Sequence, residues 1–142
     1  MPLDLDTART IIANTRESGR ASGFQPLTVV VLDAGAHVVA VEREDGSSNK
    51  RFEIAFAKAN GALAFGIGSR ALMARAETFP SFVAGATSAI GGALIPVPGG
   101  VLVRDADGQI IGAVGISGDN SDNDEAAGIV GIEAAGLTAD PG

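Results

Sequence analysis

The side chain best suited to chemistry near neutral pH is the only histidine of the chain, His37, which follows a glycine turn in the stretch "DAGAH". An imidazole in this place could ligate heme iron or act as a general base. It could equally be a half-exposed residue at a strand end whose ring nitrogen caps a carbonyl. The sequence contains no cysteine, which excludes disulfides, thiolate zinc sites and a cysteine nucleophile.

Basic side chains near the histidine would be needed to hold a ligand that carries carboxylates. Arg43 and Arg51 flank the end of the apolar stretch, and Lys58 stands in the apolar, helical sequence "AFAKANGA". Arginine binds carboxylates through two parallel hydrogen bonds, and a lysine in apolar surroundings is expected to face a pocket. The alternative is a snorkelling lysine beside solvent-facing arginines. We take His37, Arg43 and Lys58 as the candidate catalytic and ligand-binding residues.

Glycines gather at two further places, in "PGG" before one apolar segment and within "GAVGISG" in the next. Glycine inside a strand costs stability, so its repeated use indicates close approach by a ligand, a helix or a second subunit. We expect Gly99 and Gly100 to offer backbone contacts to a ligand. No glycine spacing fits a phosphate loop or a dinucleotide fingerprint, and no nucleophile elbow is present.

An acidic run, "DNSDNDE", follows the last apolar segment. Asp122 as the N-cap residue, with Glu125 three residues later, is typical of a capped helix start. The oxygen-rich run could also hold a calcium ion, but the EF-hand pattern fails at its glycine and glutamate positions. A looser divalent site stays open, and no metal is assigned. Ser117 and Asp119 are expected to face a cavity.

The elements that must position these residues follow from hydrophobic spacing. Helices are predicted over residues 4–22, about 52–63, and 122–136, with one or two shorter helical pieces between 69 and 92 that break near Pro80. Hairpins are predicted over 26–45 and 101–117, separated by a proline-punctuated loop or edge segment at 93–100. Because both strands of the first hairpin are almost continuously apolar, both faces should be covered. The order favours an α+β fold with one antiparallel sheet of four to five strands flanked by helices.

Composition narrows the function classes. The 142 residues suit one domain, residues 1–142, and the formal net charge of −7 disfavours a nucleic-acid partner. No apolar run is long enough to cross a membrane, and the acidic N-terminal stretch does not look like a signal peptide. We therefore expect a cytoplasmic protein.

Several of these stretches together resemble the GlcG/HbpS family, which includes the C-terminal heme-binding domain of PduO. They are "VEREDG", "AFAKANGALAF", "PGGVLVRDADGQIIGAVGISG" and "DEAAG". The resemblance covers about residues 3–138, and it implies a profilin-like domain that assembles into homo-oligomers, from dimers to octamers. It also implies heme as a cofactor. The chain departs from the family at Leu102, where proline is usual, and its single histidine makes bis-histidine ligation within one chain impossible.

Three hypotheses follow. The first is a small-ligand-binding domain that holds heme, or a related planar or acidic molecule, in a pocket between sheet and helices near a subunit interface. In that pocket His37 and a nearby cation, Arg43 or Lys58, would share one rim. The second is a cofactor-free lyase, isomerase or hydrolase of a small organic acid, in which the same residues move a proton and steady an anion. The third is an assembly module without chemistry.

Overall fold

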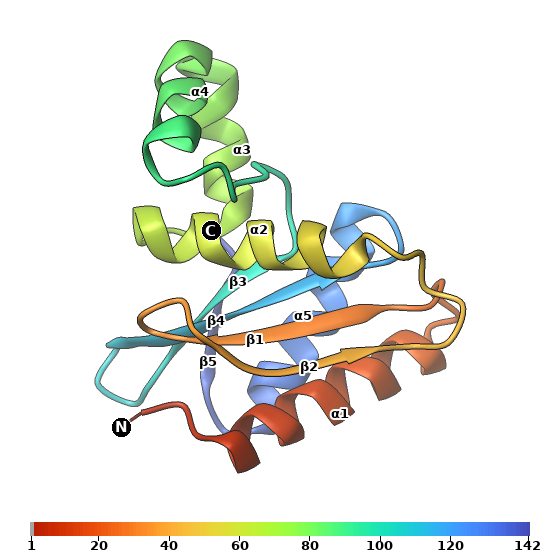
Figure 1. The fold of residues 1–142 in the computed structure, drawn as a ribbon. Coiled ribbons are helices and arrows are strands. Elements are labelled where there is room, and N and C mark those ends of the chain that lie inside the picture. The colour runs from red at the N-terminus through yellow and green to blue at the C-terminus, as the bar shows by residue number, and fades with distance from the viewer. Residues whose placement is uncertain (1) are drawn as a thin grey trace.

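The computed structural model describes residues 2–142, which form five helices and five strands (Figure 1). In chain order the elements are α1 (Leu5–Ala21), β1 (Thr28–Asp33), β2 (Val38–Arg43), α2 (Arg51–Phe65), α3 (Ser69–Thr78), α4 (Pro80–Ala89), β3 (Gly100–Arg104), β4 (Ile110–Ser117), α5 (Ser121–Ala134) and β5 (Thr138–Asp140). The helices and hairpins expected from the sequence are all present, including the helix break at Pro80.

The strands form one antiparallel sheet in the order β2-β1-β4-β3-β5. The two hairpins, β1–β2 and β3–β4, meet where β1 pairs with β4 at the centre of the sheet. The short strand β5 adds an edge next to β3, where Arg104 forms an ion pair with Asp140 at 2.9 Å. The α+β fold with a single antiparallel sheet is confirmed.

Helices cover the two faces of the sheet in separate layers. α1 and α5 pack side by side on one face, while α2 lies alone on the other (Figure 1). Strand residues alternate between the two cores, as the period-two geometry of a strand requires. Val29 and Val31 belong to the core under α1 and α5, whereas Val30 and Leu32 pack with Ala55 and other small residues of α2.

The close seating of α2 depends on glycine in the sheet. Gly100 and Gly115 are direct cross-strand partners. A Cβ atom at Gly115 would lie 1.9 Å from the carbonyl oxygen of Ala55, and one at Gly100 would lie 2.2 Å from that of Lys58. The backbone of helix α2 therefore packs directly against these two glycines.

The expectation that both strands of the first hairpin are covered on both faces is wrong for β2. All residues of β1 except Asp33 are buried, but in β2 both ends are exposed and Val38 retains 48% of its surface. β2 is an edge strand, and α2 packs over β1, β3 and β4 instead. An apolar run alone did not distinguish a central strand from an edge strand.

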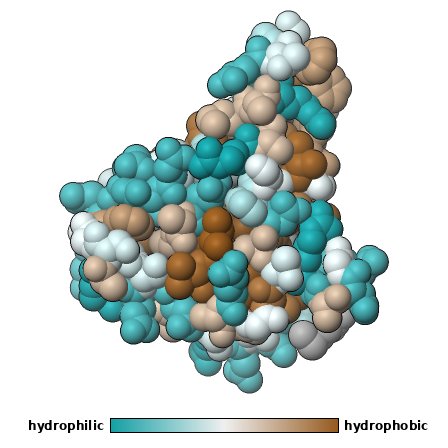
Figure 2. Space-filling view, turned by 180° about the vertical axis from the view of Figure 1, so that it is seen from behind, coloured by the Kyte–Doolittle hydropathy of each residue, from teal (hydrophilic) through white to brown (hydrophobic). Residues whose placement is uncertain are grey.

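Helices α3 and α4, which we call the arm (residues 69–89), project away from the sheet (Figure 1). Only Ser69, Leu72 and Val83 are buried in them. Figure 2 shows apolar side chains on the arm and a second apolar group on the body below it. Across residues 2–142, no helix combines the length and the apolar character that spanning a membrane would require.

Candidate functional site

The turn between β1 and β2 borders a cavity of about 410 Å³, which we call the hairpin cavity. Its lining residues are Pro2, Leu3, Asp33, Ala34, Gly35, His37, Ile110 and Ile111. The N-terminal segment and the start of β4 supply the apolar side chains, and the turn supplies one imidazole and one carboxylate. An apolar hollow with a few polar groups is the usual character of a small-molecule site.

The imidazole of His37 is paired with the carboxylate of Asp33. The Nδ1 atom lies 3.2 Å from Oδ1 and 3.3 Å from Oδ2, while 81% of the His37 side chain stays exposed. Asp33 Oδ1 also accepts hydrogen bonds from the backbone N–H groups of Gly35 and His37, each at 2.9 Å. The backbone hydrogen bond from His37 is the main cause that lowers the pKa of Asp33, so this carboxyl stays ionised into acid conditions.

The second hairpin repeats the same turn without the imidazole. Asp105 Oδ1 accepts from the backbone N–H groups of Asp107 and Gln109, again at 2.9 Å. The left-handed position is Gly108 in this turn but Ala36 in the first, at φ 65°. A left-handed backbone costs a non-glycine residue roughly 1–2 kcal/mol, so the turn beside His37 is the more strained of the two.

At the other end of the sheet lie buried and half-buried polar side chains that we call the buried polar cluster: Lys58, Asp124, Arg51, Ser117 and Ser69. Lys58 is 2% exposed, and its ammonium donates to the carbonyl of Ile116 at 2.9 Å and to Asp124 Oδ2 at 3.0 Å. Burial lowers the pKa of Lys58 and raises that of Asp124, and in each case the charge of the partner opposes the change.

The other candidate residues at this end of the sheet also make contacts within the chain. Ser117 is fully buried and accepts from Arg51 Nη1 at 3.1 Å. The backbone N–H of Gly100 donates to Ser69 Oγ at 2.7 Å, while Gly99 adopts φ 115° directly beside the ammonium of Lys58. Arg43, on β2, donates to the carbonyl of Ser47 at 2.9 Å.

The acidic run is explained by contacts within the chain. The residue that caps α5 is Asn120, whose side chain accepts from the backbone of Asn123, so the expectation of Asp122 as the N-cap is wrong. The carboxylate of Asp119 accepts a hydrogen bond from the backbone N–H of Gln25 at 2.7 Å. This bond is the main cause that lowers the pKa of Asp119. Asp122 and Glu125 both pair with Arg70. Within residues 2–142, no three histidine, cysteine, aspartate or glutamate side chains form a group that could hold a metal ion.

The structure does not bring His37 together with Arg43 and Lys58. In the antiparallel ladder, Arg43 lies opposite Thr28, the first residue of β1, whereas Asp33 is the last residue of β1. The five steps from the first to the last residue of β1, at about 3.3 Å each, place the two ends roughly 17 Å apart. Figure 1 shows the β1–β2 turn beside the N-terminus at one end of the sheet and the β4–α5 junction at the other. The expectation of one shared rim is therefore corrected: the candidates form two separate groups.

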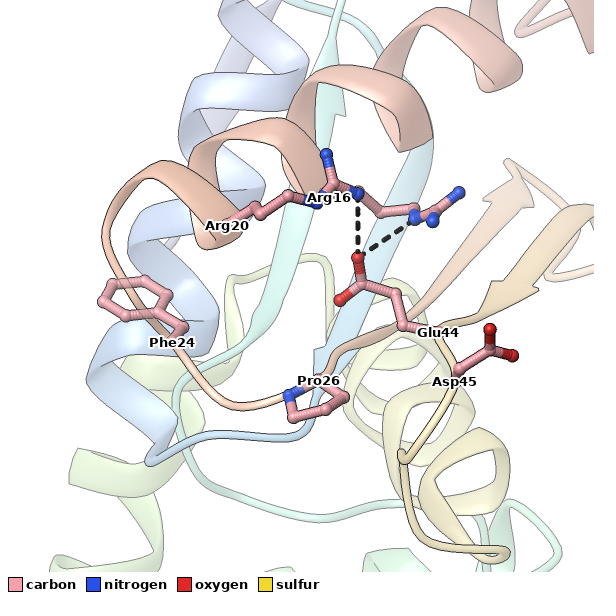
Figure 3. A pocket seen from close by; sticks show the side chains of 6 residues that line it. All are labelled: Arg16, Arg20, Phe24, Pro26, Glu44 and Asp45. Atoms are coloured by element: carbon pink, nitrogen blue, oxygen red, sulfur yellow. Dashed lines mark hydrogen bonds and ion pairs between the residues drawn. The ribbon is translucent and has the colours of Figure 1, made fainter.

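A further hollow, of about 290 Å³, lies between the end of α1 and the end of β2 (Figure 3). Arg16 and Arg20 both point to the carboxylate of Glu44, at 3.2 and 3.4 Å, and Phe24 and Pro26 also line the hollow. Glu44 also accepts from the backbone N–H of Leu27. Arg16 also pairs with Glu42, so two acids of the chain neutralise the two arginines, and these ion pairs connect α1 to the end of β2.

The sequence matches the family of "Haem degrading protein HbpS-like" over residues 3–133, and the chain belongs to this family. No protein of curated function matches it. The earlier resemblance to the GlcG/HbpS family is confirmed.

Solved structures of similar fold include the following three. The PduOC:heme complex superposes with a TM-score of 0.85 at 22% identity and covers 96% of this chain and 97% of its own. HbpS gives a TM-score of 0.79 at 24% identity over 92% and 88%. The Klebsiella pneumoniae protein ORFY gives 0.82 at 20% identity over 93% and 89%. At these identities the likeness establishes the shared fold.

The polar residue of the hairpin cavity that was missed in the sequence is Asp33. The sequence did contain a signal for this residue. Asp33 stands four residues before the only histidine, across a glycine turn, so the two side chains lie on the same short loop. The apolar lining from Leu3 and Ile111 had no such signal, because it comes from segments distant in the chain.

Proposed function

We propose that this chain binds heme in the hairpin cavity, with the imidazole of His37 as an axial ligand of the iron. The observation that carries the proposal is the His37–Asp33 pair at the mouth of an apolar cavity. Membership of the HbpS-like family and the likeness to a PduOC structure that contains heme support the same ligand. Bound heme would supply an iron centre whose redox chemistry the axial ligand tunes.

The imidazole and the apolar side chains of the cavity fit the iron and the porphyrin of this group, whereas the lining residues that the structure describes include no basic side chain for its carboxylates. The ring of His37 is exposed, and its Nδ1 is occupied by Asp33, which leaves Nε2 available to a metal. Histidines that ligate metals commonly hold a carboxylate on the other ring nitrogen. Leu3, Ile110 and Ile111 offer apolar surface to a porphyrin, and the volume of about 410 Å³ lies within the range of roughly 300–1,000 Å³ usual for ligand sites.

The first prediction concerns hemin binding. Titration of purified protein with hemin is expected to shift and sharpen the Soret band to a stoichiometric end point, because the iron gains an imidazole ligand. His37→Ala should abolish that shift. Gln109→Ala is the matched control, because Gln109 holds the same position in the other hairpin turn. A spectrum unchanged by His37→Ala, or no shift in the wild-type protein, would overturn the assignment.

We further propose that the chain forms a homo-oligomer through the arm and that the heme site lies near this interface. Phe79 and Phe82 of the arm are 60% and 58% exposed, and large apolar side chains exposed together are typical of a protein–protein interaction surface. A cavity of about 270 Å³ is lined by the β1–β2 turn residues Ala34, Gly35 and Ala36 and by Ile90, the residue that ends α4. The residue that directly follows the arm and the turn with His37 therefore border the same cavity.

The second prediction tests the arm. The double variant Phe79→Ser/Phe82→Ser is expected to lower the molar mass in solution, measured by light scattering after size exclusion, toward that of one chain. Val130→Ser provides the control, since Val130 is also a large exposed apolar residue, at 46%, but lies on α5. The role of the arm fails if the wild-type protein is monomeric or if both variants behave alike.

A further inference from the structure

The β1–β2 turn holds a carboxylate against one nitrogen of the only imidazole. Two backbone N–H groups of the turn, those of Gly35 and His37, fix Asp33 Oδ1 at 2.9 Å each. The His37 ring then lies with Nδ1 within 3.2–3.3 Å of both oxygens of this fixed carboxylate. The acceptor is therefore in place before any ligand arrives.

The second turn shows which part of this arrangement belongs to the turn alone. Asp105 accepts two backbone hydrogen bonds at the same distances, and its N–H donates to the carbonyl of Gln109 as that of Asp33 does to His37, both at 3.0 Å. An aspartate at this position thus stabilises the turn in both hairpins. The contact with an imidazole is added only in the first.

We infer that Asp33 is a positioning residue that keeps the proton of His37 on Nδ1 and so leaves the Nε2 lone pair free for a ligand. This inference rests on the proposed function and names Asp33 as the residue that prepares His37 to bind the iron. A carboxylate can only accept a hydrogen bond from the neutral ring, so the tautomer protonated on Nδ1 is favoured. The same contact raises the basicity of the other nitrogen toward a metal.

Asp33→Asn is the informative substitution. Its side-chain oxygen can retain the two backbone hydrogen bonds, while its amide NH₂ takes the place of Oδ2 and donates to Nδ1. The tautomer protonated on Nε2 should then become the major form. Asp105→Asn makes the same change in the other turn and serves as the matched control for the stability of the hairpin.

The experiment uses untagged protein labelled with [¹⁵N]histidine, in which every ring signal reports His37 because the chain has one histidine. In alkaline buffer without heme, the wild-type protein and Asp105→Asn should show Nδ1 protonated and Nε2 bare, and Asp33→Asn should show the reverse. Hemin affinity, measured separately, should fall about 10–100-fold in Asp33→Asn and stay within about twofold in Asp105→Asn.

The two readouts separate the two proposals. A tautomer that is the same in the wild-type protein and in Asp33→Asn overturns the role of Asp33, whether or not hemin binds. A tautomer that changes as expected in a protein with no affinity for hemin supports the role of Asp33 in the ring and overturns heme binding.

Discussion

Lys58→Met is expected to lower the free energy of unfolding by about 3–5 kcal/mol, because it leaves a buried carboxylate without its cation. The side chains of Lys58 and Asp124 are 3% and 1% exposed and lie 3.0 Å apart. Asp124 also accepts from the backbone of Asp119, which fixes the carboxylate in place. Urea unfolding followed by circular dichroism would measure the loss.

The exposed ion pair between Lys50 and Glu53 offers a matched control. Its side chains are 74% and 53% exposed at 3.3 Å, so Lys50→Met should change the stability by less than about 1 kcal/mol. Lys58→Met/Asp124→Asn should recover part of the loss, because the amide removes the unpaired charge and still accepts the Asp119 N–H. Equal effects of Lys58→Met and Lys50→Met would contradict a buried, paired role for Lys58.

Gly115→Ala is expected to cost about 3 kcal/mol, at the upper end of what overpacking usually costs. The added Cβ would meet the carbonyl oxygen of Ala55 at 1.9 Å and the Cβ of Ala59 at 3.1 Å. Both contacts belong to helix α2, so the helix would have to move off the sheet. We expect a melting temperature lower by roughly 10 °C in a thermal scan.

Gly85→Ala is the comparison, since a Cβ at Gly85 meets nothing within 4 Å. Gly85 lies inside α4, where alanine is the better helix former by up to about 1 kcal/mol. This variant should therefore be at least as stable as the wild-type protein. If Gly115→Ala is equally well tolerated, then α2 is not seated on the glycine pair as the structure describes.

The sequence predicted most of the fold because the signals of the fold are local. The expected helix at residues 4–22 is α1, Leu5–Ala21, and the hairpin turns carry their own glycines and aspartates. β5 was not identified because three residues have no measurable periodicity, and the ion pair of Asp140 with Arg104 that supports this strand is not local. The exposure of β2 depends on which strand ends the sheet, which composition does not reveal.

The candidate site was predicted less well, because its parts come from distant segments. Lys58 stood out by its apolar neighbours, but its partner Asp124 is 66 residues away and could not be identified from spacing. The sequence left open whether a ligand, a helix or a subunit approaches the glycines. The position of α2 shows that this helix makes the close approach at Gly100 and Gly115. The roles of His37, Arg43 and Asp119 toward a ligand stay predictions.

Because His37 is the only histidine, one measurement tests the heme proposal directly. Untagged protein labelled with [¹⁵N]histidine and loaded with ferric heme can be examined by electron–nuclear double resonance. The proposal predicts a strong hyperfine coupling of the iron to ¹⁵N from His37 that disappears in the unlabelled protein. A loaded protein without ¹⁵N coupling would show that the imidazole is no ligand of the iron, and it would contradict the site described here.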